Sequence, residues 1–165
     1  MKQLYNSADT SINTVCKIYR QADFQAGTNV LDFGGGKYNS NTEYMKEKMV
    51  SVSVYDPYNR TAEHNEKVLS EARTNKPDYV VCSNVLNVIL EDEIIDGILQ
   101  ELASFGAPAV YIAVYEGDRT GKGKATSKGF QRNEKTSVYL PKISRYFEIV
   151  STKKGIITCT PKQAN

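Results

Sequence analysis

The chain has 165 residues, of which 40% are hydrophobic, and a formal net charge of +2 at pH 7. This length and composition predict a single globular domain over residues 1–165, whereas the charge is too small by itself to indicate a nucleic-acid partner. The polar residues 1–10 differ from a signal peptide, and no apolar run is long enough to span a bilayer. The three cysteines show no metal or redox spacing and suit a reducing compartment, so a cytoplasmic protein without a membrane partner is expected.

Helical and strand patterns alternate along the chain. An apolar stripe predicts a first helix over residues 10–24. Later helices are predicted over residues 42–48, 63–73, 91–104 and 135–146. Strands rich in apolar and β-branched residues are predicted over residues 29–33, 50–55, 79–82, 109–115, 147–151 and 156–160. Pro141 is expected to delay the start of the last helix or to break it.

Strands that alternate with helices predict an α/β fold, a Rossmann-like three-layer sandwich with a mostly parallel sheet. The last two strands flank Lys153-Lys154-Gly155, which predicts a C-terminal antiparallel hairpin. In such a sheet a ligand binds beyond the carboxyl ends of the strands. Polar residues gather after those ends, namely Asp32, Asp56, Ser83, Asn84 and Glu116.

The most informative segment joins the strand at residues 29–33 to the glycines Gly34 to Gly36, and a second strand ends at Asp56, twenty positions later. Such glycines let the backbone approach a nucleoside, and an acid at the second strand end reaches ribose hydroxyls. A dinucleotide site requires a third glycine where this chain has Asn39, and no P-loop lysine motif is present. S-adenosylmethionine, which has no phosphate, is the alternative ligand, and a plain strand-to-helix turn is the third interpretation.

The pattern Asp32-x-Gly34-x-Gly36 resembles the first motif of class I S-adenosylmethionine-dependent methyltransferases. By this resemblance, Asp32 holds the methionine end of the cofactor and Asp56 binds the ribose hydroxyls. The residues proposed for cofactor binding are Asp32, Gly34, Gly35, Gly36, Asp56, Pro57, Tyr58, Ser83 and Asn84. Pro57 and Tyr58, which follow Asp56, would lie against the adenine face. Asn84 is also a catalytic candidate, with a capping role as the alternative.

Three segments carry a narrower resemblance, to small methyltransferase-like proteins of phages and prophages and to methyltransferase candidates associated with DNA-phosphorothioation genes. They are Tyr55 to Tyr58, Asn84 to Ile89 and Gly121 to Gln131. The resemblance spans about residues 28–150 and implies a phage or mobile-element origin. Only one helix fits between Asp56 and Tyr79, where a full class I methyltransferase has another strand, so the sheet is expected to lack one strand.

Residues 117–133 are predicted to form a basic, glycine-rich loop beside the cofactor. From Arg119 to Lys135, six basic residues are opposed by Glu134 alone. A mobile basic loop with aromatic residues can grip phosphates or a splayed base, so a nucleic acid or nucleotide acceptor is expected. Its expected contacts are Arg119, Lys122, Lys124 and Gln131. The alternative is a solvated loop that contributes only to solubility.

Glu116 is a candidate catalytic base whose pKa a bound substrate would raise, with loop capping as the alternative. Aligning the acceptor with a sulfonium methyl group needs no catalytic triad, and His64, the one histidine, cannot build a metal or acyl-transfer site. The sequence therefore predicts an S-adenosylmethionine-dependent methyltransferase without a metal. The alternatives are a non-catalytic cofactor-binding or phage counter-defence module and a nicotinamide-dependent reductase, which Asn39 disfavours.

Overall fold

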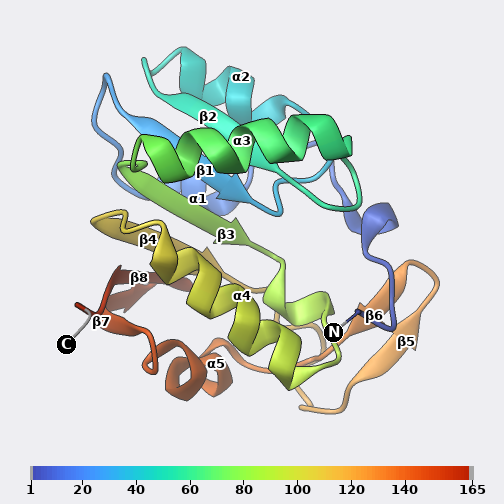
Figure 1. Ribbon diagram of the computed structural model, residues 1–165. Helices are drawn as coiled ribbons and strands as arrows, with labels where there is room; N and C mark the ends of the chain where they lie inside the picture. Colours follow the sequence, from blue (N-terminus) through green and yellow to red (C-terminus); the bar gives the residue numbers. More distant parts are fainter. Residues whose placement is uncertain (1, 164–165) are drawn as a thin grey trace.

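The computed structural model describes residues 2–163 and has a six-stranded sheet at its centre (Figure 1). Its strands are β1 Asn29–Phe33, β2 Ser51–Tyr55, β3 Tyr79–Ser83, β4 Ala109–Ala113, β7 Phe147–Lys153 and β8 Ile156–Pro161. They lie in the order β2-β1-β3-β4-β8-β7. The first four pair in parallel, whereas β8 pairs antiparallel with both β4 and β7. The predicted α/β fold, with its mostly parallel sheet and C-terminal antiparallel hairpin, is confirmed.

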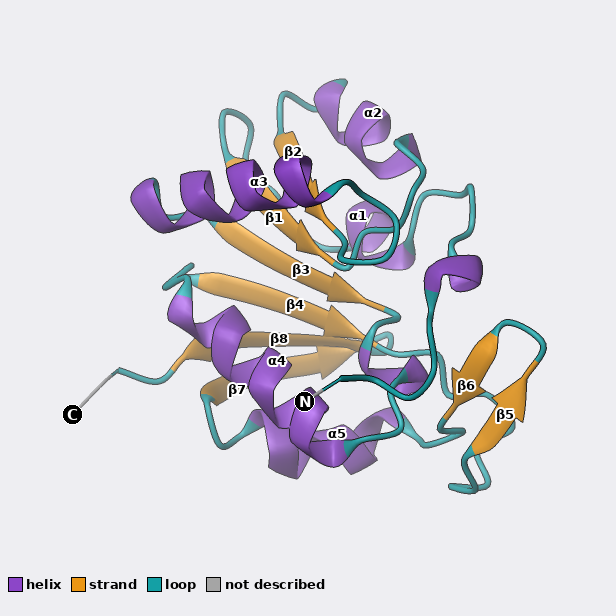
Figure 2. Cartoon of the chain, turned by 45° about the vertical axis from the view of Figure 1, so that its right-hand side comes forward, coloured by secondary structure: helices purple, strands orange, loops and turns teal. Residues whose placement is uncertain are grey.

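Helices cover both faces of the sheet (Figure 2). They are α1 Lys17–Gln21, α2 Ser40–Lys46, α3 Ala62–Thr74, α4 Asp92–Ser104 and α5 Thr136–Ile143. The helices α1 and α2 pack on the face that carries Val30 and Tyr111, whereas α3, α4 and α5 pack on the face that carries Leu31 and Cys82. Because side chains alternate along a strand, Asp32 lies on the same face as Val30, toward α1 and α2.

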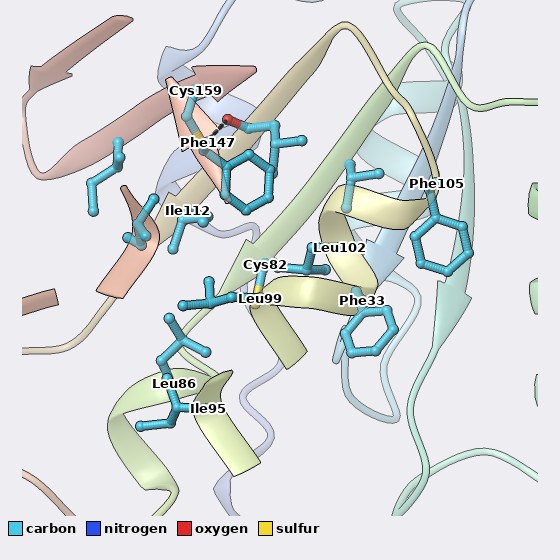
Figure 3. Packing of buried hydrophobic residues seen from close by; sticks show 14 of the residues in the cluster. Phe33, Cys82, Leu86, Ile95, Leu99, Leu102, Phe105, Ile112, Phe147 and Cys159 are labelled. Carbon is cyan, nitrogen blue, oxygen red and sulfur yellow. Dashed lines mark hydrogen bonds between the residues drawn. The ribbon is translucent and has the colours of Figure 1, made fainter. Parts of the chain in front are cut away.

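The larger apolar core lies beneath α4 (Figure 3). Ile95, Leu99 and Leu102 recur at helical spacing and are fully buried against a cluster that includes Cys82 and Ile112. Burying each of these side chains stabilises the fold by about 1.5–3 kcal/mol. This packing confirms the amphipathic helix predicted over residues 91–104 and holds β3 and β4 in place.

The strand β2 lies at the edge of the sheet, because α3 alone connects it to β3 and residues 2–163 provide no strand beyond it. The structure therefore confirms the prediction that the sheet lacks a strand between Asp56 and Tyr79. The Thr61 hydroxyl caps α3 by accepting from the backbone N–H of His64 at 3.1 Å. The His64 ring lies 2.6 Å from the carbonyl oxygen of Val54, so this histidine joins α3 to β2.

No helix within the described residues is long and apolar enough to cross a bilayer.

The helix predicted over residues 10–24 is wrong in extent. A short 3-10 helix, η1, spans Ala8–Thr10, and α1 begins only at Lys17. Residues 11–16 are irregular, and Ile12, expected on the buried stripe, is 60% exposed. Serine, asparagine and threonine in this stretch favour local side-chain bonds over helix. The backbone N–H of Cys16 donates instead to Asn41 Oδ1 at 2.9 Å, which ties the segment to α2.

Two further predictions require correction. The loop predicted over residues 117–133 contains a hairpin of β5 Lys124–Thr126 and β6 Gly129–Gln131, which form a separate two-stranded sheet. The helix α5 neither starts late nor breaks at Pro141 but continues to Ile143. Tyr139 and Ile143 are fully buried on either side of Pro141, so tertiary packing holds the helix through the proline. The other predicted elements are present within three residues of their predicted bounds.

Arg132 anchors the end of this hairpin to the start of α4. Its guanidinium donates to the carbonyl oxygens of Ile89 and Leu90 at 2.9 and 3.0 Å. It also pairs with Asp92 at 2.7 Å and with Glu134 at 2.6 Å, while its own side chain is 11% exposed. Arg132 is therefore a structural cation, and it is not free to grip a phosphate.

Replacing Arg132 with methionine is expected to destabilise the fold, because Glu134 would remain largely buried without its cation. We expect a loss of roughly 3 kcal/mol and a fall of the melting temperature by roughly 6–12 °C. The matched control is Arg119→Met, because Arg119 is 59% exposed and makes one 3.5 Å ion pair with Glu116. This control should change the unfolding free energy by less than about 0.5 kcal/mol. Equal melting temperatures for the two variants would contradict the anchoring role.

Candidate functional site

A tight turn joins β1 to α2 at the carboxyl edge of the sheet. Gly34 and Gly36 have φ angles of +87° and +79°, a conformation that favours glycine. The backbone N–H groups of Gly34 and Gly35 both donate to the carbonyl oxygen of Tyr55, at 2.7 and 3.3 Å. The turn is therefore fastened to the end of β2.

Asp32 lies beneath this turn and is 1% exposed. A Cβ atom on Gly35 would lie 2.8 Å from Asp32 Cγ and 2.8 Å from Val54 Cγ1, so only glycine lets the turn cover the carboxylate. Burial raises the pKa of Asp32 to about 7; the Tyr19 hydroxyl opposes this rise and the Asp56 carboxylate adds to it. Within the described chain, Asp32 Oδ2 has no hydrogen-bond partner. Buried polar atoms are rarely left unpaired, so this oxygen is an unused acceptor enclosed beneath the turn.

Asp56 ties the turn to the segment that follows β2. Its Oδ2 accepts from Gly36 N at 2.9 Å, and its Oδ1 accepts from Tyr58 N and Asn59 N at 2.9 and 3.0 Å. The two acids that the sequence separates by 24 positions thus meet around one glycine turn. Oδ1 also accepts from Asn59 Nδ2 at 3.3 Å, so the lone pair that Asp56 keeps for a ligand hydroxyl is on Oδ2, which accepts only from Gly36 N within the described residues.

Sequence reasoning missed two side chains that stabilise this turn and the segment after β2, Arg60 and Asn65. Arg60 donates to the carbonyl oxygen of Gly36 at 2.9 Å and to Asn39 Oδ1 at 3.0 Å. Asn65 accepts from Asp56 N at 3.0 Å and donates to Asp56 O at 2.8 Å. No motif marks these residues, and only their spacing after Asp56 could have indicated them. Asn39, which replaces the third glycine of a dinucleotide motif, is part of this bracing.

A cavity of about 290 Å³, here called the cofactor cavity, opens at the carboxyl ends of β1, β2 and β3. All of the residues predicted to bind the cofactor line it: Asp32, Gly34, Gly35, Gly36, Asp56, Pro57, Tyr58, Ser83 and Asn84. Its charged groups are the carboxylates of Asp32, Asp56 and Glu101, with no lysine, arginine or histidine among the described lining residues. The cavity therefore favours a cationic ligand and disfavours a pyrophosphate.

The N-terminal strap, residues 2–16, forms the outer wall of this cavity. The residues that it contributes are Gln3, Ser7, Thr10, Ser11, Ile12, Thr14 and Cys16. Gln3 Oε1 accepts from the Tyr58 hydroxyl at 2.9 Å, and Leu4 N donates to Glu91 Oε1 at 2.8 Å. Sequence reasoning missed this wall because it placed residues 10–24 in a helix.

The β5–β6 hairpin supports the strap from outside (Figure 2). The Phe130 ring stacks on the Tyr5 ring with centroids 5.2 Å apart and an interplanar angle of 19°. A Cβ atom on Gly129 would lie 2.9 Å from the carbonyl oxygen of Asn6, so hairpin and strap are in close contact. The hairpin is thus coupled to the cofactor cavity through the strap.

Asn84 lies between the cofactor cavity and a second cavity. It has a φ of +57°, and its backbone N–H donates to the carbonyl oxygen of Ala113 at 2.8 Å. The second cavity, of about 270 Å³, lies between the strap, α1 and the ends of β3 and β4. The residues that line both cavities are Ile12, Thr14, Cys16, Ser83 and Asn84. The amide of Asn84 forms no hydrogen bond within the described residues and is exposed, so it is free to meet a ligand.

The structure does not bring Glu116 to either cavity. Its Oε2 accepts from Thr136 N at 2.6 Å, at the start of α5. This hydrogen bond, together with the charge of Arg119, holds the pKa of Glu116 below its ordinary value. In the free protein the pKa of Glu116 is thus lowered, which fits the alternative of a capping role, and its rise on substrate binding stays a prediction.

The residues predicted to contact the acceptor also line neither cavity: Arg119, Lys122, Lys124 and Gln131. Gln131 Oε1 accepts from Asn87 Nδ2 at 3.3 Å, which fastens the hairpin to the segment after β3. The three basic side chains are exposed on or near the hairpin. They can meet an acceptor only where it extends beyond the cavities.

Cys16, Cys82 and Cys159 are free thiols, and burial raises the pKa of Cys16 to about 11, so it is not an activated nucleophile. In residues 2–163, no three histidine, cysteine or acidic side chains gather where they could hold a metal ion.

Neither the family models nor the curated proteins match this chain. Solved structures, by contrast, do match this chain. A methyltransferase from Aquifex aeolicus that depends on S-adenosylmethionine is similar with a TM-score of 0.55 and 14% identity, over 88% of each chain. A candidate S-adenosylmethionine-dependent methyltransferase from Listeria monocytogenes matches with a TM-score of 0.54 and 10% identity, over 88% of this chain and 96% of that one.

A third similar structure is a candidate methyltransferase in complex with the Trm112 methyltransferase activator from Haloferax volcanii. Its TM-score is 0.54 and its identity 12%, over 81% of this chain and 67% of that chain. The chain therefore has the fold of the S-adenosylmethionine-dependent methyltransferases. Its own residues fit that cofactor, because the cavity beside the glycine turn contains three carboxylates and, among its described lining residues, no cation.

Replacing Gly35 with alanine should disturb the turn, because the new Cβ would collide with Asp32 and Val54. We expect a loss of about 1–3 kcal/mol in unfolding free energy. Gly97 on α4 has no atom within 4 Å of its Cβ position, so Gly97→Ala should instead gain about 0.5–1 kcal/mol through helix propensity. Thermal unfolding measures both, and a Gly35→Ala variant as stable as Gly97→Ala would contradict the close approach.

Replacing Asp32 with asparagine should stabilise the ligand-free protein at pH 8. The pKa of Asp32 is about 7 in the fold, above its ordinary value of 3.8, so the folded state holds the proton more tightly and stability falls as pH rises between these values. Asparagine has no such ionisation, so its melting temperature should exceed that of the wild type by roughly 5–10 °C at pH 8. The difference should vanish near pH 4. A constant difference from pH 4 to 8 would show that Asp32 does not titrate in this way.

Proposed function

We propose that the chain is a methyltransferase that uses S-adenosylmethionine. The observation that carries this proposal is the Asp32 carboxylate, which lies beneath a glycine turn in the lining of an acidic cavity. The ligand that suits this site carries positive charge and a small polar end that fits beneath the turn. S-adenosylmethionine meets both conditions, with a sulfonium and an ammonium group.

Each part of the cofactor has a counterpart in the cofactor cavity. Asp32 would accept from the ammonium group, and Asp56 from the ribose hydroxyls. Pro57 and Tyr58 would lie against the adenine, and Ser83 with Asn84 would meet the methionine end or the acceptor. A nicotinamide dinucleotide fits less well, because the described lining residues offer its pyrophosphate no cation.

When bound, the cofactor supplies an electrophilic methyl group on a sulfonium centre, and its transfer to an acceptor lone pair leaves a neutral thioether. The chain contributes position and exclusion of water. The strap covers the cofactor cavity, and the exposed amide of Asn84 orients the acceptor from the wall between the cavities. Glu116 has no place in this arrangement.

A nucleic acid or nucleotide is the acceptor that we propose. Support comes from the unpaired basic side chains of the hairpin region, Lys122 and Lys124, which would meet phosphates outside the cavities. The phage or phosphorothioation link and the cytoplasmic location stay predictions from the sequence. A second candidate function is cofactor binding without transfer, because the described lining of the second cavity has no acid or histidine to accept a proton.

Calorimetric titration with S-adenosylmethionine tests the cofactor site. We expect micromolar binding that strengthens up to tenfold per pH unit between pH 5.5 and 7, because binding requires ionised Asp32. Asp32→Asn should bind at least tenfold more weakly at pH 7.5 and lose this pH dependence. The control is Asp118→Asn, whose carboxylate lies outside the cofactor cavity, on Thr120. Absence of binding by a protein shown to be folded would contradict the proposal.

Asn84→Gly tests the transfer step. Glycine adopts the positive φ of Asn84 without strain, so this variant removes the amide and keeps the backbone. Transfer of a tritiated methyl group from the cofactor to separated nucleic-acid, small-molecule and protein fractions should fall by roughly 10- to 100-fold. The dissociation constant of the cofactor is measured for the same variant, so that a loss of transfer is separated from a loss of cofactor binding. If the wild type labels no fraction, the binding-module alternative replaces the enzyme.

A further inference from the structure

The second cavity differs in charge from the cofactor cavity. Its described lining contains Lys17 and Arg20 and no carboxylate. Neither cation forms an ion pair within the described residues. By contrast, the described lining residues of the cofactor cavity include three carboxylates and no cation. Two cavities that share a wall therefore have opposite charge.

Further basic residues surround the second cavity. The turn at Lys153, Lys154 and Gly155 joins β7 to β8, and a Cβ atom on Gly155 would lie 2.6 Å from Lys17 Nζ. Because β8 runs antiparallel to β4, with Ile157 opposite Ile112, this turn lies at the carboxyl edge of the sheet. Both lysines of the turn are exposed. The positive charge beside the cavity thus exceeds that of its own lining.

The remaining walls are suited to a small molecule with an apolar body. Val15, Ala113 and Val114 supply apolar surface, and the Tyr115 ring is 59% exposed beside them. A volume of about 270 Å³ is near the lower end of ligand pockets, which hold roughly 300–1,000 Å³. One nucleotide-sized unit is therefore the largest occupant that this geometry favours.

We propose that the second cavity binds the methyl acceptor, and that the acceptor is a small molecule with a phosphate or carboxylate group held by Lys17 and Arg20. This proposal rests on the proposed methyltransferase function, because the shared wall at Asn84 places the acceptor against the cofactor. It narrows the proposed acceptor to a nucleotide-sized anion recognised at α1, in place of a longer nucleic acid held by the lysines of the hairpin region. Two cations on adjacent turns of one helix can bind a single anionic group from two sides.

Nuclear magnetic resonance titration of the full chain, saturated with S-adenosylhomocysteine, tests the proposal. The probes are adenosine monophosphate for phosphate, benzoate for carboxylate, and adenosine as the uncharged match. The bound nucleoside prevents the probes from entering the cofactor cavity. We expect one anionic probe to bind and to shift the backbone signals of Ser83, Asn84 and Tyr115, with adenosine binding at least tenfold more weakly. If adenosine monophosphate binds, the acceptor carries a phosphate group. If benzoate binds, it carries a carboxylate group.

The variant Lys17→Gln/Arg20→Gln should weaken binding of that probe by tenfold or more, with an unchanged affinity for S-adenosylhomocysteine. The matched control is Lys67→Gln/Lys76→Gln, which removes two exposed cations that line neither cavity and should leave probe binding unaltered. A separate variant, Arg119→Gln/Lys122→Gln, removes two cations of the hairpin region. Absence of binding by both anions overturns the proposal, and so does a loss that appears only in this hairpin variant, which would indicate a longer nucleic acid. Failure of the wild type to bind S-adenosylhomocysteine would instead overturn the proposed function and this inference together.

Discussion

The burial of one carboxylate beneath a glycine turn is the constraint on which the site depends. Asp32 reaches its position because β1 points it toward α1 and α2, and Gly35 covers it because no Cβ intervenes. The backbone N–H of Gly36 donates to Asp56, which also accepts from the backbone N–H of Tyr58. Loss of the glycine turn would therefore separate the two acids on which ligand recognition depends.

This burial costs stability in the free protein, since an ionised carboxylate is poorly solvated there. The Tyr19 hydroxyl, Asn41 and the charge of Arg60 offset only part of this cost, and a bound cation or a proton would relieve more of it. A site that binds a cation can use such an arrangement, because the charge that destabilises the free fold strengthens the complex. Arg60 and Asn65 brace the turn through its backbone and leave the carboxylate unneutralised by a direct ion pair.

The site residues near the glycine turn could be predicted because they follow consecutive strands of a parallel sheet, whose carboxyl ends meet at one edge. The strap could not, since its position depends on contacts with distant residues, such as Tyr5 on Phe130 and Gln3 on Tyr58. The same error hid Lys17, which a continuous helix over residues 10–24 would have placed on a solvent face. The capping contact of Glu116 could not be predicted because its partner, Thr136, is twenty residues away in sequence.

The most direct test of this account is the titration of the Asp32 side-chain carboxyl carbon by nuclear magnetic resonance, with and without S-adenosylhomocysteine. The account predicts a pKa near 7 in the free protein and a clearly lower pKa in the complex, because the bound ammonium group stabilises the ionised form. A pKa near 4 in the free protein would contradict the burial of the carboxylate. A pKa that stays near 7 in the complex would contradict its role in binding the cofactor.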